Sequence, residues 1–184
     1  ARFNMIEQQI RPWNVLNQKV LDLLEIIKRE NFVSTGLEKL AFTDCDLPIR
    51  VNGVDTGEAM FSPKMEARIL QEIELGTHEK VLEIGTGTGY MAALMAQQCA
   101  HVTTIELNPA IAELARSNLK KNGITRVKVL DGCGFQLAPT LGQFDAIVLS
   151  GATPTMPAGL LEAVNPLGRL MAVVGRAPAM QLVF

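Results

Sequence analysis

Little in this sequence points to a nucleic acid or a membrane. The chain has 17 Lys and Arg against 19 Asp and Glu, which gives a formal net charge of −2 and a pI of about 5.7. We therefore expect no broad basic surface of the kind that binds nucleic acid. No apolar run is long enough to span a membrane, and the N-terminus lacks the basic-then-apolar pattern of a signal peptide.

Cysteine and histidine are also scarce. Cys45, Cys99 and Cys133 are odd in number and lack metal-type spacing. They predict reduced thiols, a cytoplasmic location and no metal site. His78 and His101 are isolated, and we expect structural roles for them.

The size and composition of the chain predict one compact domain. A chain of 184 residues that is 48% hydrophobic can bury one substantial core. Residues 1–60 are expected to form a helical and loop extension that packs on a core over 61–184. Apolar positions at helical spacing predict a helix over 15–32, whereas breakers such as Asn52-Gly53 predict an irregular segment over 34–61. Such a segment in a compact enzyme is often a binding surface.

The most informative segment runs from Lys80 to Tyr90. A short apolar run feeds a loop with glycine at every second position, Gly85-Thr86-Gly87-Thr88-Gly89, and a helix-compatible stretch over 91–96 follows. A strand, a glycine turn and a helix bring backbone amides close to a small polar cofactor in α/β domains.

The spacing of this loop favours S-adenosylmethionine (SAM) over a dinucleotide. The dinucleotide fingerprint is Gly-x-Gly-x-x-Gly, whereas this loop reads Gly-x-Gly-x-Gly and follows a carboxylate, Glu83. A carboxylate repels a pyrophosphate but attracts a cation. SAM carries a sulfonium and an ammonium and has no phosphate. A tight glycine turn without a ligand is the alternative interpretation.

Two further strands are predicted to end in acids. The run 101–106 ends in Glu106, whose carboxylate could accept hydrogen bonds from ribose hydroxyls, and Leu107 follows it. The run 126–130 ends in Asp131-Gly132, where the acid could accept the exocyclic amine of adenine and the glycine leaves room for the ring. A solvated strand end and an ordinary turn are the alternatives.

The remaining elements alternate. Helices are predicted after Ser62-Pro63 and Asn108-Pro109, each with an N-cap and a first-turn proline, and over 157–164. Strands are predicted over 144–149 and 169–174, with another beginning near 180. The alternation predicts a doubly wound, mostly parallel sheet. The sequence stops on an apolar residue, so we expect that more protein follows.

With these residues in view, the sequence resembles the protein-L-isoaspartate (D-aspartate) O-methyltransferase family. The resemblance spans nearly the whole chain and includes the segments at 29–33, 40–44, 81–90, 131–132, 144–147 and 166–170. It implies a Rossmann-like SAM-dependent methyltransferase fold. It also implies an enzyme that methylates the carboxyl group of isoaspartyl or D-aspartyl residues in damaged proteins. Gly85, Gly87 and Glu106 would then hold the cofactor, with Asp131-Gly132 at the adenine.

One segment departs from the family pattern. Family members typically carry Thr-Ile-Ser before the proline-started helix, and the serine is held to be needed for activity. Alignment on Pro63 places Phe61 at the serine position, with Ser62 one residue later, and Glu66 replaces a frequent histidine. Ser62 is therefore the candidate catalytic residue, with helix N-cap as a compatible alternative role. Glu66 should repel a substrate carboxylate unless it is turned away or protonated.

Three functional classes follow from these observations. The first is a SAM-dependent carboxyl methyltransferase that acts on isoaspartyl-containing protein or peptide, through alignment and desolvation, without a metal or a general base. The second keeps the SAM site but has another substrate or no turnover, as Phe61 and Glu66 suggest. The third, a nicotinamide-dependent oxidoreductase, is disfavoured by Glu83 and the glycine spacing.

Overall fold

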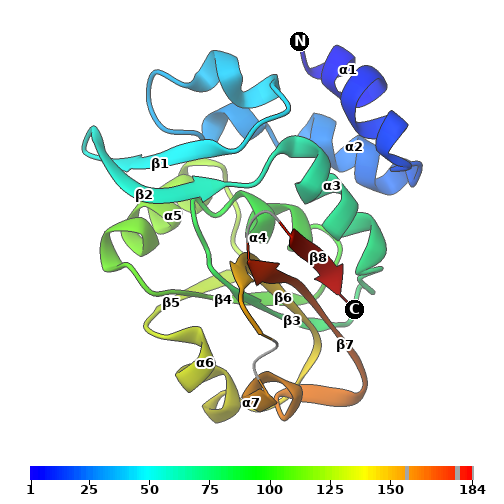
Figure 1. The fold of residues 1–184 in the computed structure, drawn as a ribbon, viewed down its shortest axis with the longest axis vertical. Helices are drawn as coiled ribbons and strands as arrows, with labels where there is room; N and C mark the ends of the chain where they lie inside the picture. The colour runs from blue at the N-terminus through cyan, green and yellow to red at the C-terminus, as the bar shows by residue number, and fades with distance from the viewer. Residues whose placement is uncertain (156–157, 177–178, 184) are drawn as a thin grey trace.

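A six-stranded sheet forms the centre of the fold in the computed structural model, which describes residues 1–155, 158–176 and 179–183 (Figure 1). The strand order is β5-β4-β3-β6-β7-β8, and all neighbours are parallel except β7 and β8. The strands are β3 (Lys80–Ile84), β4 (His101–Glu106), β5 (Val127–Asp131), β6 (Phe144–Thr153), β7 (Val164–Arg176) and β8 (Ala179–Val183). The chain first builds outward from β3 through β4 to β5 and then restarts at β6 on the other side of β3. This reversal confirms the predicted doubly wound sheet and creates a switch point between β3 and β6.

Two helical layers cover the sheet (Figure 1). Helices α3 (Pro63–Glu72), α4 (Tyr90–Met95) and α5 (Pro109–Lys121) pack on one face, and α6 (Gly134–Leu137) and α7 (Ala158–Leu161) lie on the other. Successive strand residues divide between the two cores: Val81 belongs to the first and Leu82 to the second. This division follows from the two-residue period of a strand whose faces are both buried.

The N-terminal segment packs on the same core as α3 to α5. It contains α1 (Arg2–Met5), a π-helical turn (Ile6–Ile10), α2 (Gln18–Ile26), β1 (Leu47–Val51) and β2 (Val54–Met60), with 3₁₀ turns at Arg11–Trp13, Arg29–Asn31 and Glu38–Phe42. Met5, Leu24 and Ile49 are buried in the cluster that contains Val81. The extension therefore shares its hydrophobic core with the sheet.

Two predictions for this segment hold only in part. The helix expected over 15–32 begins after Asn17, whose side chain accepts a 3.0 Å bond from the Lys19 amide, and ends at Ile26 because Ile27 is extended. The segment 34–61, expected to be irregular, contains the β1–β2 hairpin. Asn52 and Gly53 both have positive φ, 52° and 81°, as a two-residue type I′ turn requires. The pair is thus a hairpin turn between strands and not a break.

Most other elements agree with the sequence. Helix α5 begins after Asn108, whose side chain accepts a 3.0 Å bond from the Ala110 amide. Ser62 holds the N-cap position of α3, but its side chain makes no capping hydrogen bond. Part of the helix expected over 157–164 is found as α7, while Pro157 lies outside the described residues, as does Phe184 after β8. Helix α6 was not predicted.

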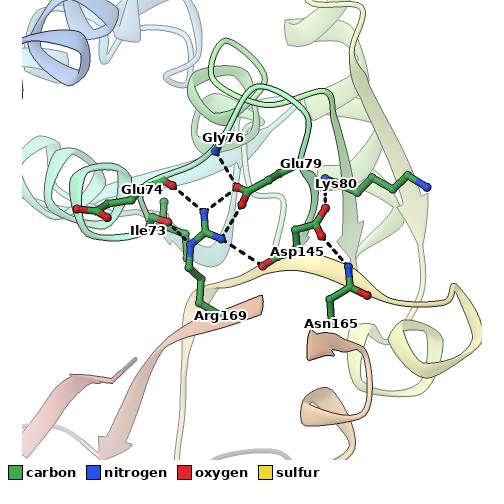
Figure 2. Close-up of polar contacts among 8 residues, drawn as sticks. All are labelled: Ile73, Glu74, Gly76, Glu79, Lys80, Asp145, Asn165 and Arg169. Carbon is green, nitrogen blue, oxygen red and sulfur yellow. Dashed lines mark hydrogen bonds and ion pairs between the residues drawn. The ribbon is translucent and has the colours of Figure 1, made fainter. Parts of the chain in front are cut away.

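Arg169 ties the end of α3 to the sheet (Figure 2). Its guanidinium donates to the carbonyls of Ile73 and Glu74 at 2.5 and 2.7 Å, and to the carboxylate of Glu79 at 2.7 and 2.8 Å. Beside it, Asp145 of β6 accepts a 2.8 Å bond from the Lys80 amide at the start of β3. These contacts hold the amino-terminal end of β3 in place. The glycine loop begins at the carboxyl-terminal end of the same strand.

Candidate cofactor site

A cavity of about 240 Å³ lies at the carboxyl ends of the parallel strands, at the switch point between β3 and β6. Open α/β sheets bind their ligands at this place. Its walls come from the loop after β3, the end of β4, the segment after β5, the end of β6, the β1–β2 hairpin and Ile111 of α5. Ile84, Ile105 and Leu149 provide apolar lining at the three central strand ends.

The glycine loop lines this cavity with backbone. Gly85 and Gly87 both belong to its wall and have positive φ values of 90° and 53°. A Cβ at Gly85 would lie 3.3 Å from the carbonyl oxygen of Ser150, so β3 and β6 approach closely there. A Cβ at Gly89 would lie 3.2 Å from Leu119 of α5. The alternating glycines thus serve the backbone conformation and the close packing around the cavity.

Glu106 joins the glycine loop to the end of β4. One carboxylate oxygen accepts a 3.0 Å bond from the Gly87 amide, and the other accepts a 3.0 Å bond from the Asn108 amide. The residue is buried and lines the cavity, as does the more exposed Leu107. The structure therefore brings together Gly85, Gly87, Glu106 and Leu107, as the sequence predicted.

Glu83 lies beneath the loop and is fully buried. Its two carboxylate oxygens accept 2.7 Å bonds from the hydroxyls of Thr104 and Ser150. Thr86 continues this network, since its hydroxyl lies 2.7 Å from that of Thr104. Desolvation raises the pKa of Glu83 to about 7, against the opposing effect of the two hydroxyl donors. Glu83 and Thr86 line a second, smaller cavity of about 30 Å³.

Asp131 and Gly132 are not among the residues that line the larger cavity. The Asp131 carboxylate accepts a 2.8 Å bond from Arg116 of α5, and the Gly132 amide donates to the carbonyl of Glu106. The wall is instead formed by Cys133, Gly134 and Phe135, which follow directly. Sequence reasoning missed these three residues, although their position just after a strand end was a usable signal.

The segment that departs from the family pattern borders the smaller cavity. Phe61 and Glu66 line it, whereas Ser62 is buried without lining either cavity. Glu66 accepts a 2.8 Å bond from the guanidinium of Arg29, and both side chains are almost fully buried. Burial raises the pKa of Glu66 to about 7, although Arg29 acts in the opposite direction.

Arg29 was not predicted as a functional residue, although it lies in one of the segments that carry the family resemblance. Besides Glu66, it donates to the carbonyls of Ala41 and Phe61 at 2.9 and 2.6 Å. The Glu66 carboxylate thus has a cation beside it. Arg29 also positions the backbone that leads into α3.

The lining of the two cavities selects among cofactors. Glu58 and Glu106 line the larger cavity, Glu66 and Glu83 line the smaller one, and among the described residues neither wall contains a Lys or Arg. Carboxylates in the walls repel the pyrophosphate of a dinucleotide, whereas the acidic and apolar lining fits a cationic, phosphate-free cofactor. In the described part of the chain, no group of three His, Cys, Asp or Glu residues could hold a metal ion. The fold and this site together define the class of SAM-dependent methyltransferases.

Within this class, the chain belongs to the protein-L-isoaspartate (D-aspartate) O-methyltransferase family, whose sequence profile matches residues 2–184. The chain is similar to a protein-L-isoaspartate O-methyltransferase of Methanoculleus marisnigri, with 38% identity over 182 residues that cover 99% of this chain and 80% of the relative. A protein of the same name from Koribacter versatilis is 34% identical over 183 residues, which cover 100% and 80% of the two chains.

Solved structures agree on the fold. A Plasmodium falciparum protein assigned to the same enzyme class, in complex with S-adenosyl-L-homocysteine, matches with a TM-score of 0.82 at 17% identity. The match covers 98% of this chain and 87% of that chain. The Rossmann-like methyltransferase fold predicted from the sequence is thereby confirmed.

Proposed function

We propose that this chain transfers a methyl group from SAM to the free carboxylate of isoaspartyl or D-aspartyl residues in proteins or peptides. The observation that carries the proposal is the cavity at the β3–β6 switch point, with acidic walls and no Lys or Arg among its described lining residues. The family match over residues 2–184 supplies the substrate class.

The chemistry asks the protein mainly for alignment. Bound SAM supplies an electrophilic methyl group: its carbon–sulfur bond breaks, the carbon–oxygen bond of a methyl ester forms, and the electron pair stays on the sulfur of S-adenosylhomocysteine. A carboxylic acid in water has a pKa of about 4 and is already ionised at neutral pH, so no side chain has to remove a proton. Orientation and exclusion of water can lower such a barrier by about 7–11 kcal/mol.

We assign the cofactor to the larger cavity, where the strand ends and the glycine loop hold it. Glu106 accepts the ribose hydroxyls, the backbone of Gly85, Thr86 and Gly87 follows the methionine part, and Leu107 contributes apolar contact. Glu83 lies buried beneath the loop, and its assignment to the cofactor stays a prediction. The assignment of Asp131-Gly132 to adenine stays a prediction, and the lining by Cys133 to Phe135 supports a position for the ring on that segment.

A second candidate function keeps the SAM site and changes the methyl acceptor. It is favoured by one observation, that Phe61 lines the smaller cavity at the position where the resemblance expects a serine, while Ser62 lines neither cavity. The role of Ser62 as catalytic residue stays a prediction. Its test is the loss of methyl transfer in Ser62→Ala.

The test of the proposed function is transfer of a radiolabelled methyl group from SAM to an isoaspartyl peptide, with the normal aspartyl peptide as the control. The proposal expects a base-labile ester on the isoaspartyl peptide alone. Absence of transfer, with SAM binding intact, selects the second candidate.

Among the residues that the structure describes, none of the helices has the length and hydropathy of a membrane span. We propose that the partners are isoaspartyl-containing proteins or peptides. The three free cysteines support the predicted cytoplasmic location.

A further inference from the structure

The two cavities adjoin each other at the end of β3. They share four lining residues: Ala59, Gly85, Gly87 and Ser150. Because glycine and alanine have no polar side chain, Ser150 is the only residue in the described chain whose side chain can offer a hydrogen bond at this junction. A methyl acceptor has to bind next to the cofactor, and these shared residues lie where the smaller cavity adjoins the cofactor cavity.

Ser150 is held in place by the strands on both sides of the switch point. It follows Leu149, which pairs in register with Ile84 of β3. Its carbonyl lies against Gly85, and its hydroxyl donates a 2.7 Å bond to the buried Glu83. Ser150 therefore lines both cavities, and its hydroxyl is bonded to the buried acid beneath the glycine loop.

We propose that the Ser150 hydroxyl binds the methyl-accepting carboxylate, and that Glu83 in its acid form turns this hydroxyl toward the acceptor. The inference rests on the proposed function and names the residue that orients its substrate. A serine hydroxyl has one proton to donate. When Glu83 is ionised it takes that proton in a hydrogen bond, but when Glu83 is protonated it donates to Ser150, and the serine proton is free for the acceptor.

The surroundings of Glu83 favour this arrangement. Burial raises its pKa to about 7, and the neighbouring carboxylates Glu106 of β4 and Glu66 of α3 add to the effect. The cation Arg29 is bonded to Glu66 and to two carbonyls, and no contact joins it to Glu83. An ionised Glu83 would repel an incoming carboxylate, whereas a neutral acid that donates through Ser150 attracts it.

The first test separates acceptor binding from cofactor binding. Ser150→Ala, Ser150→Thr and the control Thr140→Ala, which removes an exposed hydroxyl outside both cavities, are compared. Calorimetry measures the affinity for S-adenosylhomocysteine and then the affinity of that complex for an isoaspartyl peptide. Ser150→Ala should leave the first within about twofold and weaken the second by about 10- to 100-fold, the usual effect of losing a hydrogen bond to a charged group. Ser150→Thr should restore peptide affinity to within about threefold.

The second test is the pH profile of kcat/KM. In the wild type it should fall above about pH 7, as Glu83 loses its proton. Glu83→Gln keeps an N–H donor to Ser150 and a carbonyl acceptor for Thr104 but cannot ionise, so its kcat/KM profile should lose this alkaline fall. An unchanged fall in Glu83→Gln contradicts the role of Glu83.

Two other outcomes separate this inference from the proposed function. If the wild type methylates the peptide and Ser150→Ala binds and turns it over normally, only the inference about Ser150 is wrong. If the wild type binds S-adenosylhomocysteine but neither binds nor methylates the peptide, the proposed function fails, and the acceptor role of Ser150 fails with it.

Discussion

Replacing Arg29 by Met should destabilise the fold strongly. The guanidinium donates to the Glu66 carboxylate at 2.8 Å and to the carbonyls of Ala41 and Phe61, with Arg29 and Glu66 side chains only 1% and 4% exposed. Without it, Glu66 is left as a buried carboxyl group without its cation. Removing one partner of a buried ion pair typically costs about 3–5 kcal/mol.

The loss should also depend on pH. Burial already raises the pKa of Glu66 to about 7, and removal of Arg29 takes away the largest effect that lowers it. A group whose pKa is raised on folding loses its contribution to stability as the pH rises toward the folded-state value. The destabilisation by Arg29→Met should therefore be larger at pH 8 than at pH 6, by about 1.4 kcal/mol for each pH unit over which Glu66 has to hold its proton.

Urea denaturation and thermal melting measure this effect. For a chain of this size, 3–5 kcal/mol corresponds to a decrease in Tm of about 6–20 °C. Replacing both Arg29 and Glu66 by apolar residues should cost less than the sum of the two single changes, because neither charge is then left buried alone. A loss below about 1 kcal/mol for Arg29→Met, or strict additivity in the cycle, would refute the buried ion pair as the reason that Glu66 is tolerated.

Three further predictions concern the site and its support. Gly134→Ala should destabilise the fold by about 1–3 kcal/mol, because its Cβ would lie 2.4 Å from a side-chain carbon of the half-buried Ile84. Urea denaturation measures this loss, and an unchanged midpoint would contradict the prediction. Arg169→Ala should lose about 1–3 kcal/mol in the same assay, because it removes the bonds to Glu79 and two carbonyls (Figure 2), and a neutral result would count against that cluster. Because folding raises the pKa of Glu83 from 4.5 to about 7, its contribution to the free energy of unfolding should fall by up to about 3 kcal/mol between pH 4.5 and 7. Urea denaturation of Glu83→Gln should show a flatter dependence of stability on pH over this range.

Most elements of the fold could be predicted from local sequence patterns. The strand, glycine loop and helix over 80–96 are adjacent in sequence, so residue type and spacing were enough to predict them. The helix after Asn108 was predicted by its cap and first-turn proline in the same way. The Asn52-Gly53 turn shows the limit: the same two residues break an element or join two strands, and only the partner strands decide which.

The site was predictable where it depended on a single strand end and not where it depended on distant contacts. Glu106 follows from its position after a β-type run. The Arg29–Glu66 pair joins residues 37 positions apart, on segments whose packing no local pattern reveals. Asp131 ends a predicted strand as Glu106 does, so the sequence predicted the same kind of role for both. In the structure the Asp131 carboxylate is bonded to Arg116 of α5.

The central claim is that a cationic, phosphate-free cofactor binds at the β3–β6 switch point through Glu106. The most direct measurement is calorimetric titration of the wild type and of Glu106→Ala with SAM, and of the wild type with NADH. The wild type should bind SAM and not NADH, and Glu106→Ala should bind SAM at least tenfold more weakly, with its fold intact by circular dichroism. Unchanged SAM affinity in Glu106→Ala, or binding of NADH in place of SAM, would contradict the account.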